Sequence, residues 1–148
     1  MSDRTPQYAC ADPLLGTWKL QSFKTEYQDT GLTNEPFGAH PSGYLSYGPD
    51  CRVYAIVAGE GRKPPAGDVP TDAEKVELFG GMGAYAGAYT IDGDKVIHHI
   101  DISWNEAWTG TAQVRQFKIE GNTLQIRAEN LEDGRPGLST LVWTKVQP

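Results

Sequence analysis

The sequence lacks the basic surface of a nucleic-acid-binding protein and the long apolar run of a membrane protein. Its 148 residues include 13 basic and 19 acidic side chains, which gives a formal net charge of −6, and the basic residues form no run. The longest apolar stretch, residues 53–58, is far too short to cross a bilayer. We therefore expect neither a nucleic acid nor a membrane as a partner.

Cysteine is scarce as well, with only Cys10 and Cys51 in the chain. Residues 1–8 contain no apolar segment of the kind that a secretory signal needs. A domain of this length can also bury a sufficient hydrophobic core without a disulfide. We therefore expect a cytoplasmic protein with two free thiols, and a Cys10–Cys51 disulfide is the less favoured alternative.

No motif in the sequence indicates a metal or a cofactor. The three histidines, at positions 40, 98 and 99, lack the spacing of zinc ligands. The glycine-rich stretch 80–83 is not followed by the lysine and serine of a phosphate-binding loop, and no Gly-x-Ser-x-Gly elbow is present. We expect no metal and no cofactor, and no feature indicates an oligomeric state.

What the sequence does contain is frequent turns, with 17 glycines and 10 prolines between short segments of alternating apolar and polar residues. The predicted strands cover residues 16–25, 43–47, 52–58, 85–91, 95–103, 110–119, 123–128 and 138–146. Closing them into a barrel leaves no bare edge. The predicted fold is an all-β, eight-stranded antiparallel up-and-down barrel, one domain over residues 14–148 after a flexible lead at 1–13.

One helix is predicted between the third and fourth of these strands. Thr71-Asp72-Ala73-Glu74 has the hydroxyl and the glutamate of a capping box, spaced three residues apart. The helix is expected to run from about Thr71 to Phe79 and to cover one opening of the barrel.

Six pieces, in order along residues 14–146, carry a family resemblance: Leu15-Gly16-Thr17-Trp18-Lys19-Leu20, Gly43 with Leu45 and Tyr47, 85–89, 92–99, 110–117, and Leu141-Val142-Trp143. Together they resemble the lipocalin-like domain family of small bacterial and fungal proteins. The resemblance implies an eight-stranded barrel with an internal pocket and Trp18 as a plug at one end. It implies no single activity. Secreted lipocalins place an arginine of the last strand against that tryptophan, and the nearest candidate here is Lys145.

The alternation of each strand decides which polar side chains enter the barrel. On the strand at 110–119, Gln113 and Arg115 share a face with Phe117 and Ile119. An interior guanidinium needs a partner and suits a carboxylate or a similar planar anion. Arg115 is therefore predicted to anchor an acidic or carbonyl oxygen of a ligand. The alternative is a structural arginine, bonded to backbone carbonyls or to a glutamate, or simply exposed.

On the strand at 95–103, hydrophobic counting places His98 inward with Ile100 and Ile102, and His99 outward. His98 is the candidate catalytic residue, because a neutral imidazole both donates and accepts a hydrogen bond. The alternative is a core histidine bonded to a tyrosine hydroxyl. The predicted ligand-binding pocket is lined by five residues: Tyr89, His98, Gln113, Arg115 and Trp143.

Three functions remain open from the sequence. The first is binding of a small, mostly hydrophobic molecule with an acidic or carbonyl group inside the barrel. The second is a cofactor-free isomerase, cyclase or lyase that acts on such a molecule, with His98 as acid–base and Arg115 or a tyrosine stabilising negative charge. The third is a structural or interaction domain whose barrel is filled by its own side chains.

Overall fold

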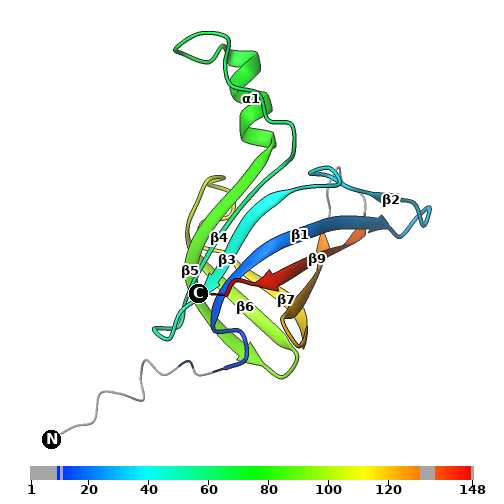
Figure 1. Ribbon diagram of the computed structural model, residues 1–148, viewed down its shortest axis with the longest axis vertical. Coiled ribbons are helices and arrows are strands. Elements are labelled where there is room, and N and C mark those ends of the chain that lie inside the picture. The colour runs from blue at the N-terminus through cyan, green and yellow to red at the C-terminus, as the bar shows by residue number, and fades with distance from the viewer. Residues whose placement is uncertain (1–9, 11, 131–135, 148) are drawn as a thin grey trace, which may run out of the picture.

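The structure, a computed structural model, describes residues 10, 12–130 and 136–147. It confirms the predicted fold, because eight antiparallel strands of the described chain close into one barrel through the pairing of β1 with β9 (Figure 1). A two-residue strand, β2, adds to the far end of β1. The flexible lead predicted at 1–13 lies mostly outside the described residues. The elements are β1 (Gly16–Tyr27), β2 (Thr33–Asn34), β3 (Ser42–Tyr47), β4 (Arg52–Ala58), α1 (Asp72–Gly80), β5 (Met82–Asp92), β6 (Lys95–Ser103), β7 (Ala112–Glu120), β8 (Thr123–Asn130) and β9 (Gly137–Lys145).

Trp18 closes one end of the barrel, which we call the Trp18 end. Its side chain is 1% exposed, and its indole Nε1 donates a 2.9 Å hydrogen bond to the carbonyl of Leu14. The Lys145 ammonium lies 4.8 Å from the centre of the Trp18 ring and donates to the carbonyl of Leu15. Lys145 therefore occupies the position at which secreted lipocalins place an arginine, and its ammonium makes a cation–π contact with the Trp18 ring.

Gly16 explains how Lys145 reaches that position. It has a backbone φ of 118°, a value that side-chain-bearing residues rarely adopt. A Cβ at Gly16 would also stand 2.6 Å from the Cε atom of Lys145. Glycine at the start of β1 therefore leaves the space in which the lysine packs over Trp18.

A β-bulge changes the inward face of β6. The pairing of β5 with β6 shifts register between Ala86 and Gly87, so that Ile100 points inward while Ile102 points outward with 64% of its surface exposed. The prediction that Ile102 shares the inward face with His98 is therefore wrong. Gly87 lies at the shift, where a Cβ would collide with the backbone of His99. Here the glycine permits close approach of two strands.

The helix α1 begins as predicted but does not cover the barrel. Thr71 caps it, with its side chain accepting from the Glu74 amide at 3.2 Å and the Glu74 carboxylate accepting from the Thr71 amide at 2.8 Å. The helix buries none of its residues and stands out beyond the ends of β4 and β5 (Figure 1). Its predicted role as a cover is therefore wrong. We call this end of the barrel, with the loop between β6 and β7, the helix end.

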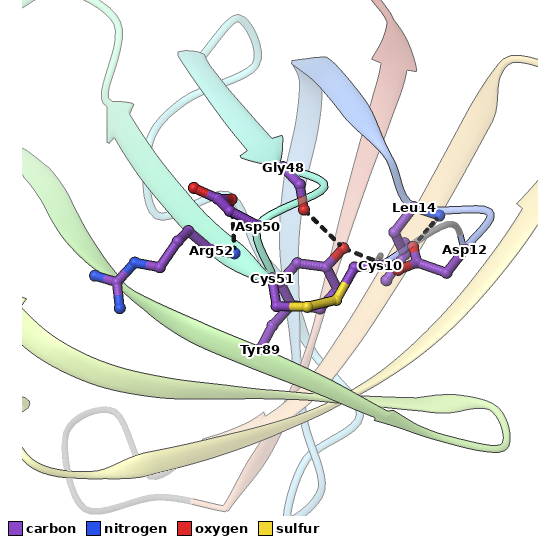
Figure 2. Close-up of a disulfide and its surroundings, with 8 residues drawn as sticks. All are labelled: Cys10, Asp12, Leu14, Gly48, Asp50, Cys51, Arg52 and Tyr89. Atoms are coloured by element: carbon purple, nitrogen blue, oxygen red, sulfur yellow. Dashed lines mark hydrogen bonds between the residues drawn. A yellow bond between two sulfur atoms is a disulfide. The ribbon is translucent and has the colours of Figure 1, made fainter. Parts of the chain in front are cut away.

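The expectation of two free thiols is also wrong. Cys10 and Cys51 form a disulfide, with their Cα atoms 5.4 Å apart (Figure 2). The chain before β1 passes under the Trp18 end, where the Cys10 amide bonds to the Pro49 carbonyl in the turn between β3 and β4. The fold therefore brings together two cysteines that are 41 residues apart in sequence. Because disulfides are typical of oxidising compartments, the thiol argument for a cytoplasmic protein no longer holds.

Candidate functional site

A row of polar side chains runs through the barrel interior and is centred on His98. The imidazole is 1% exposed. Its Nε2 lies 2.7 Å from the hydroxyl of Tyr47 on β3, and its Nδ1 lies 2.6 Å from the hydroxyl of Tyr85 on β5. Both ring nitrogens are thus occupied by tyrosines. His98 therefore matches the alternative predicted from the sequence, a core histidine bonded to a tyrosine hydroxyl. His99, by contrast, points outward to the Thr90 hydroxyl.

Burial keeps these three groups uncharged at neutral pH. It lowers the pKa of His98 to about 3, with smaller contributions from the charges of Arg115 and His99. It also raises the pKa of Tyr47 well above its ordinary value, and that of Tyr85 is raised for the same reason. The row therefore carries hydroxyl and imidazole dipoles and no charge of its own.

Arg115 supplies the charge next to this row. It lies on the inward face of β7 and is half-buried. Its guanidinium carbon stands 6.0 Å from the centre of the Trp108 ring, and its Nη1 donates a long hydrogen bond of 3.4 Å to the backbone carbonyl of Val114. Among the described residues it forms no ion pair with a carboxylate. Arg115 is thus an inward-facing cation without a counter-ion in the described part of the barrel.

Gln113 connects Arg115 to the loop at the helix end. A long contact of 3.5 Å joins the Arg115 Nη1 to the Gln113 Oε1, and the Gln113 Nε2 donates to the Thr111 hydroxyl at 2.8 Å. Thr111 donates in turn to the carbonyl of Trp108 at 2.6 Å. The polar row therefore continues from the interior to the rim of the barrel.

Aromatic rings follow the same path from the helix to the core. Neighbouring ring centroids along this column are between 5.5 and 6.1 Å apart. In order from the helix end, its members are Phe79, Trp104, Trp108, Tyr85, His98 and Tyr47. Arg115 and Gln113 thus lie beside an apolar wall, an arrangement that suits an amphipathic small molecule.

The structure brings three of the five predicted pocket residues together. His98, Gln113 and Arg115 are linked by pairing of His98 with Gln113 across β6 and β7 and by the contacts described above. Trp143 lies on β9, 3% exposed, opposite Leu20 and Leu124. Among the described residues, no hydrogen bond or ring contact joins Trp143 to the other four.

Tyr89 is opposite His98 in the strand register, as predicted, but its hydroxyl points away from it. The hydroxyl donates to the Asp12 carboxylate at 2.8 Å and lies 3.3 Å from the Gly48 carbonyl, beside the disulfide (Figure 2). Burial, followed by the hydrogen bond to Asp12, raises the pKa of Tyr89. The Tyr89 hydroxyl therefore bonds at the Trp18 end, while its ring packs edge-on against Tyr47 of the polar row, with 4.8 Å between the ring centroids.

The pocket predicted from the sequence did not include Tyr47, Tyr85 or Trp108. Tyr85 is opposite Ser103 in the register, yet its long side chain reaches back to His98. A tyrosine hydroxyl lies far from its own Cα, so the nearest cross-strand neighbour is a poor guide to its partner. The alternation Tyr85, Gly87, Tyr89 was the signal that could have identified it.

Two hollows on the described surface lie outside the polar row. One, of about 380 Å³, lies between the segment at 36–38, the segment at 59–66 and α1. The other, of about 290 Å³, lies on β7 and β8 around Gln116 and Arg127. Neither is lined by any of the five predicted residues. The inward-facing side chains of β7 are nevertheless half-buried and not fully buried, so part of their surface stays accessible.

Within residues 10, 12–130 and 136–147, no three histidine, cysteine or carboxylate side chains gather as metal ligands. The helix in this part of the chain is neither long nor apolar enough to span a membrane.

Comparisons with known proteins identify one family. A family model described as a lipocalin-like domain matches residues 15–146. Among solved structures, the chain is similar to a lipocalin-like protein from Bacteroides uniformis ATCC 8492, with 15% sequence identity and a TM-score of 0.49; the match covers 90% of this chain and 98% of that chain. No curated protein matches the chain.

Proposed function

Because the chain belongs to the lipocalin-like domain family, we propose that its barrel binds a small, mostly apolar molecule that carries an acidic or carbonyl oxygen. The observation that carries this proposal is Arg115, an inward-facing guanidinium with no carboxylate partner among the described residues. Removing a cation from water without a partner is costly, so an interior arginine is rarely retained without one. A ligand oxygen supplies the missing partner.

The surroundings of Arg115 define the rest of the ligand. Trp108 lies against the guanidinium, and Tyr85 packs against Trp108 with 5.8 Å between the ring centroids and 30° between the ring planes. These rings offer a flat apolar surface, while Gln113 adds one amide close to the cation. The ligand is therefore expected to place its oxygen at Arg115 and its apolar body along the aromatic column.

The two alternative functions have less support. An acid–base role for His98 needs a free ring nitrogen, and both are hydrogen-bonded to tyrosines. A barrel filled by its own side chains would bury the inward face of β7, which stays half-buried. Binding is thus favoured over both turnover at His98 and a purely structural role.

A pair of fluorescent probes of similar shape tests the proposal. 8-Anilino-1-naphthalenesulfonate is anionic, whereas N-phenyl-1-naphthylamine is neutral, and both emit strongly only in apolar surroundings. Arg115→Met should weaken binding of the anionic probe by about 2–5 kcal/mol, the range seen when one partner of a buried charge pair is removed. It should leave the affinity for the neutral probe nearly unchanged.

Arg127→Met is the matched control, because Arg127 lies on the exposed outer face of β8. It removes the same charge from the protein without touching the interior. Equal loss of the anionic probe in both variants would show that the overall charge, or the surface hollow beside Arg127, decides binding and that Arg115 has no special role. No binding of either probe to the wild-type protein would contradict the proposed function.

A further inference from the structure

We propose that Tyr85 selects ligands by donating a hydrogen bond to them, and that the buried Tyr47–His98 pair fixes it in that role. The part of this inference that concerns ligand selection rests on the proposed binding function, whereas the part that concerns the His98 tautomer does not. It narrows the ligand class to molecules that present an acceptor oxygen, such as a ketone, a carboxylate or an enolate. Molecules that offer only donors are disfavoured.

The Tyr47–His98–Tyr85 row has one more hydroxyl proton than it needs for its own two hydrogen bonds. A neutral imidazole has one N–H and one bare nitrogen. It therefore donates to one tyrosine and accepts from the other. The tyrosine that accepts from His98 keeps its own O–H proton free for a further partner. The two tautomers differ in which tyrosine holds that spare proton.

Burial decides between the two tautomers. If His98 donated from Nε2, the spare proton would be on Tyr47, which is 1% exposed and has His98 as its hydrogen-bond partner among the described residues. A buried hydroxyl proton without an acceptor is costly. If His98 donates from Nδ1, Tyr47 gives its proton to Nε2, and the spare proton is on half-buried Tyr85. The second arrangement satisfies every fully buried group.

Arg115 and Tyr85 both lie against the ring of Trp108. The Arg115 guanidinium, which has only donors, stands 6.0 Å from the centre of that ring, and the centre of the Tyr85 ring stands 5.8 Å from it. In the favoured tautomer the Tyr85 oxygen accepts from Nδ1 of His98, so its own proton is directed away from His98. The Tyr85 O–H and the Arg115 N–H are therefore two donors beside the same aromatic ring, and together they are complementary to one electron-rich oxygen.

Nitrogen NMR of His98 tests the proton count without any ligand. Long-range proton–nitrogen spectra distinguish a protonated ring nitrogen from a bare one, and the variants His40→Gln and His99→Gln identify the other two histidines. At pH 7 we expect the proton of His98 on Nδ1 and a bare Nε2. A proton on Nε2, or on both nitrogens, would overturn the inference while leaving the proposed function intact.

A carbonyl probe tests the consequence for binding. 6-Propionyl-2-(dimethylamino)naphthalene is neutral, has a ketone acceptor, and changes its emission colour when that ketone is hydrogen-bonded. Tyr85→Phe should weaken its binding by about three- to tenfold, the effect of one hydrogen bond, and shift its emission to the blue. N-Phenyl-1-naphthylamine, which lacks an acceptor carbonyl, should bind equally well to both proteins.

Two further variants separate positioning from general damage. Tyr47→Phe removes the hydrogen-bond donor to Nε2 of His98, so both His98 tautomers should be populated. The ketone probe should then emit at shorter wavelength than in the wild-type protein, but by less than in Tyr85→Phe, although Tyr47 does not touch the ligand. Tyr54→Phe on the exposed outer face of β4 should change neither readout. Unchanged ketone binding and emission in Tyr85→Phe would overturn the inference, whatever the result with Arg115→Met.

Discussion

The Trp18 end and the helix end of the barrel differ in how far their polar groups are paired within the protein. At the Trp18 end, the indole N–H of Trp18, the hydroxyl of Tyr89 and the ammonium of Lys145 each have a protein partner, whereas the buried Nε1 of Trp143, opposite Leu20, has none among the described residues. Towards the helix end, Arg115 has no carboxylate among the described residues, and the buried Nε1 of Trp104 has no partner there. The Trp18 end mainly stabilises the fold, whereas the helix end has hydrogen-bond donors that a ligand can use.

Because the Trp18 end stabilises the fold, we expect the largest loss of stability when the Trp18 side chain is truncated. Trp18→Ala should reduce the free energy of unfolding by about 3–5 kcal/mol, as truncations of large core aromatics do. Chemical denaturation followed by circular dichroism measures the change. A loss below about 1 kcal/mol would show that Trp18 does not close the barrel.

The disulfide should give the next largest effect. Replacing both cysteines with serine should cost about 2–4 kcal/mol, since the bridge joins residues 41 apart and restricts the unfolded chain. Denaturation midpoints with and without a reductant should shift for the wild-type protein only. If thiol titration of unreduced, unfolded protein finds two free groups, the bridge is absent and this part of the account fails.

Acid should destabilise the barrel through His98. Its folded pKa of about 3 lies below the ordinary value of 6.5, so the unfolded chain binds a proton that the folded chain does not. Stability therefore falls as the pH drops through this window, by about 1–2 kcal/mol between pH 6.5 and 5. Urea unfolding of wild type and His98→Gln measures the difference in slope.

His99→Gln is the control for this pH dependence, because His99 is exposed on the same strand. It should keep the wild-type slope, whereas His98→Gln should flatten it. Parallel slopes for all three proteins would contradict a neutral, buried His98.

The smallest effect on stability is expected at the helix end. Arg115→Met should leave the free energy of unfolding unchanged or raise it by about 0.5 kcal/mol, because it replaces an unpaired inward-facing cation with an apolar side chain. Thermal and urea unfolding without ligand check this. A loss of 2 kcal/mol or more would assign Arg115 a structural role and remove the contrast between the two ends.

Strand periodicity explains why so much of this arrangement could be predicted. Side chains alternate strictly along a strand, so the inward direction of His98, Gln113 and Arg115 follows from counting. Counting fails where a bulge inserts a residue, and Ile102 lies just beyond such a point. The helix cap was also predictable, because the capping box is a local interaction between Thr71 and Glu74.

Contacts that depend on three-dimensional reach could not be predicted in this way. A spacing of 41 residues says nothing about whether Cys10 and Cys51 meet, since that depends on how the chain crosses beneath Trp18. Tyr85 and Tyr89 share one face of β5, but their hydroxyls lie in different regions, at His98 and at Asp12. The sequence identifies the face and leaves the direction of the long side chain undecided.

The four tryptophans allow the central claim to be tested in one spectrum. Each indole N–H gives a separate proton–nitrogen NMR signal, and the assignments follow from single Trp→Phe variants. Titration with 8-anilino-1-naphthalenesulfonate should shift the signals of Trp108 and Trp104, beside Arg115 and at the rim, and leave that of Trp18 in place. Shifts at Trp18 with none at Trp108, or no shift in any indole, would contradict a binding site at the helix end of the barrel.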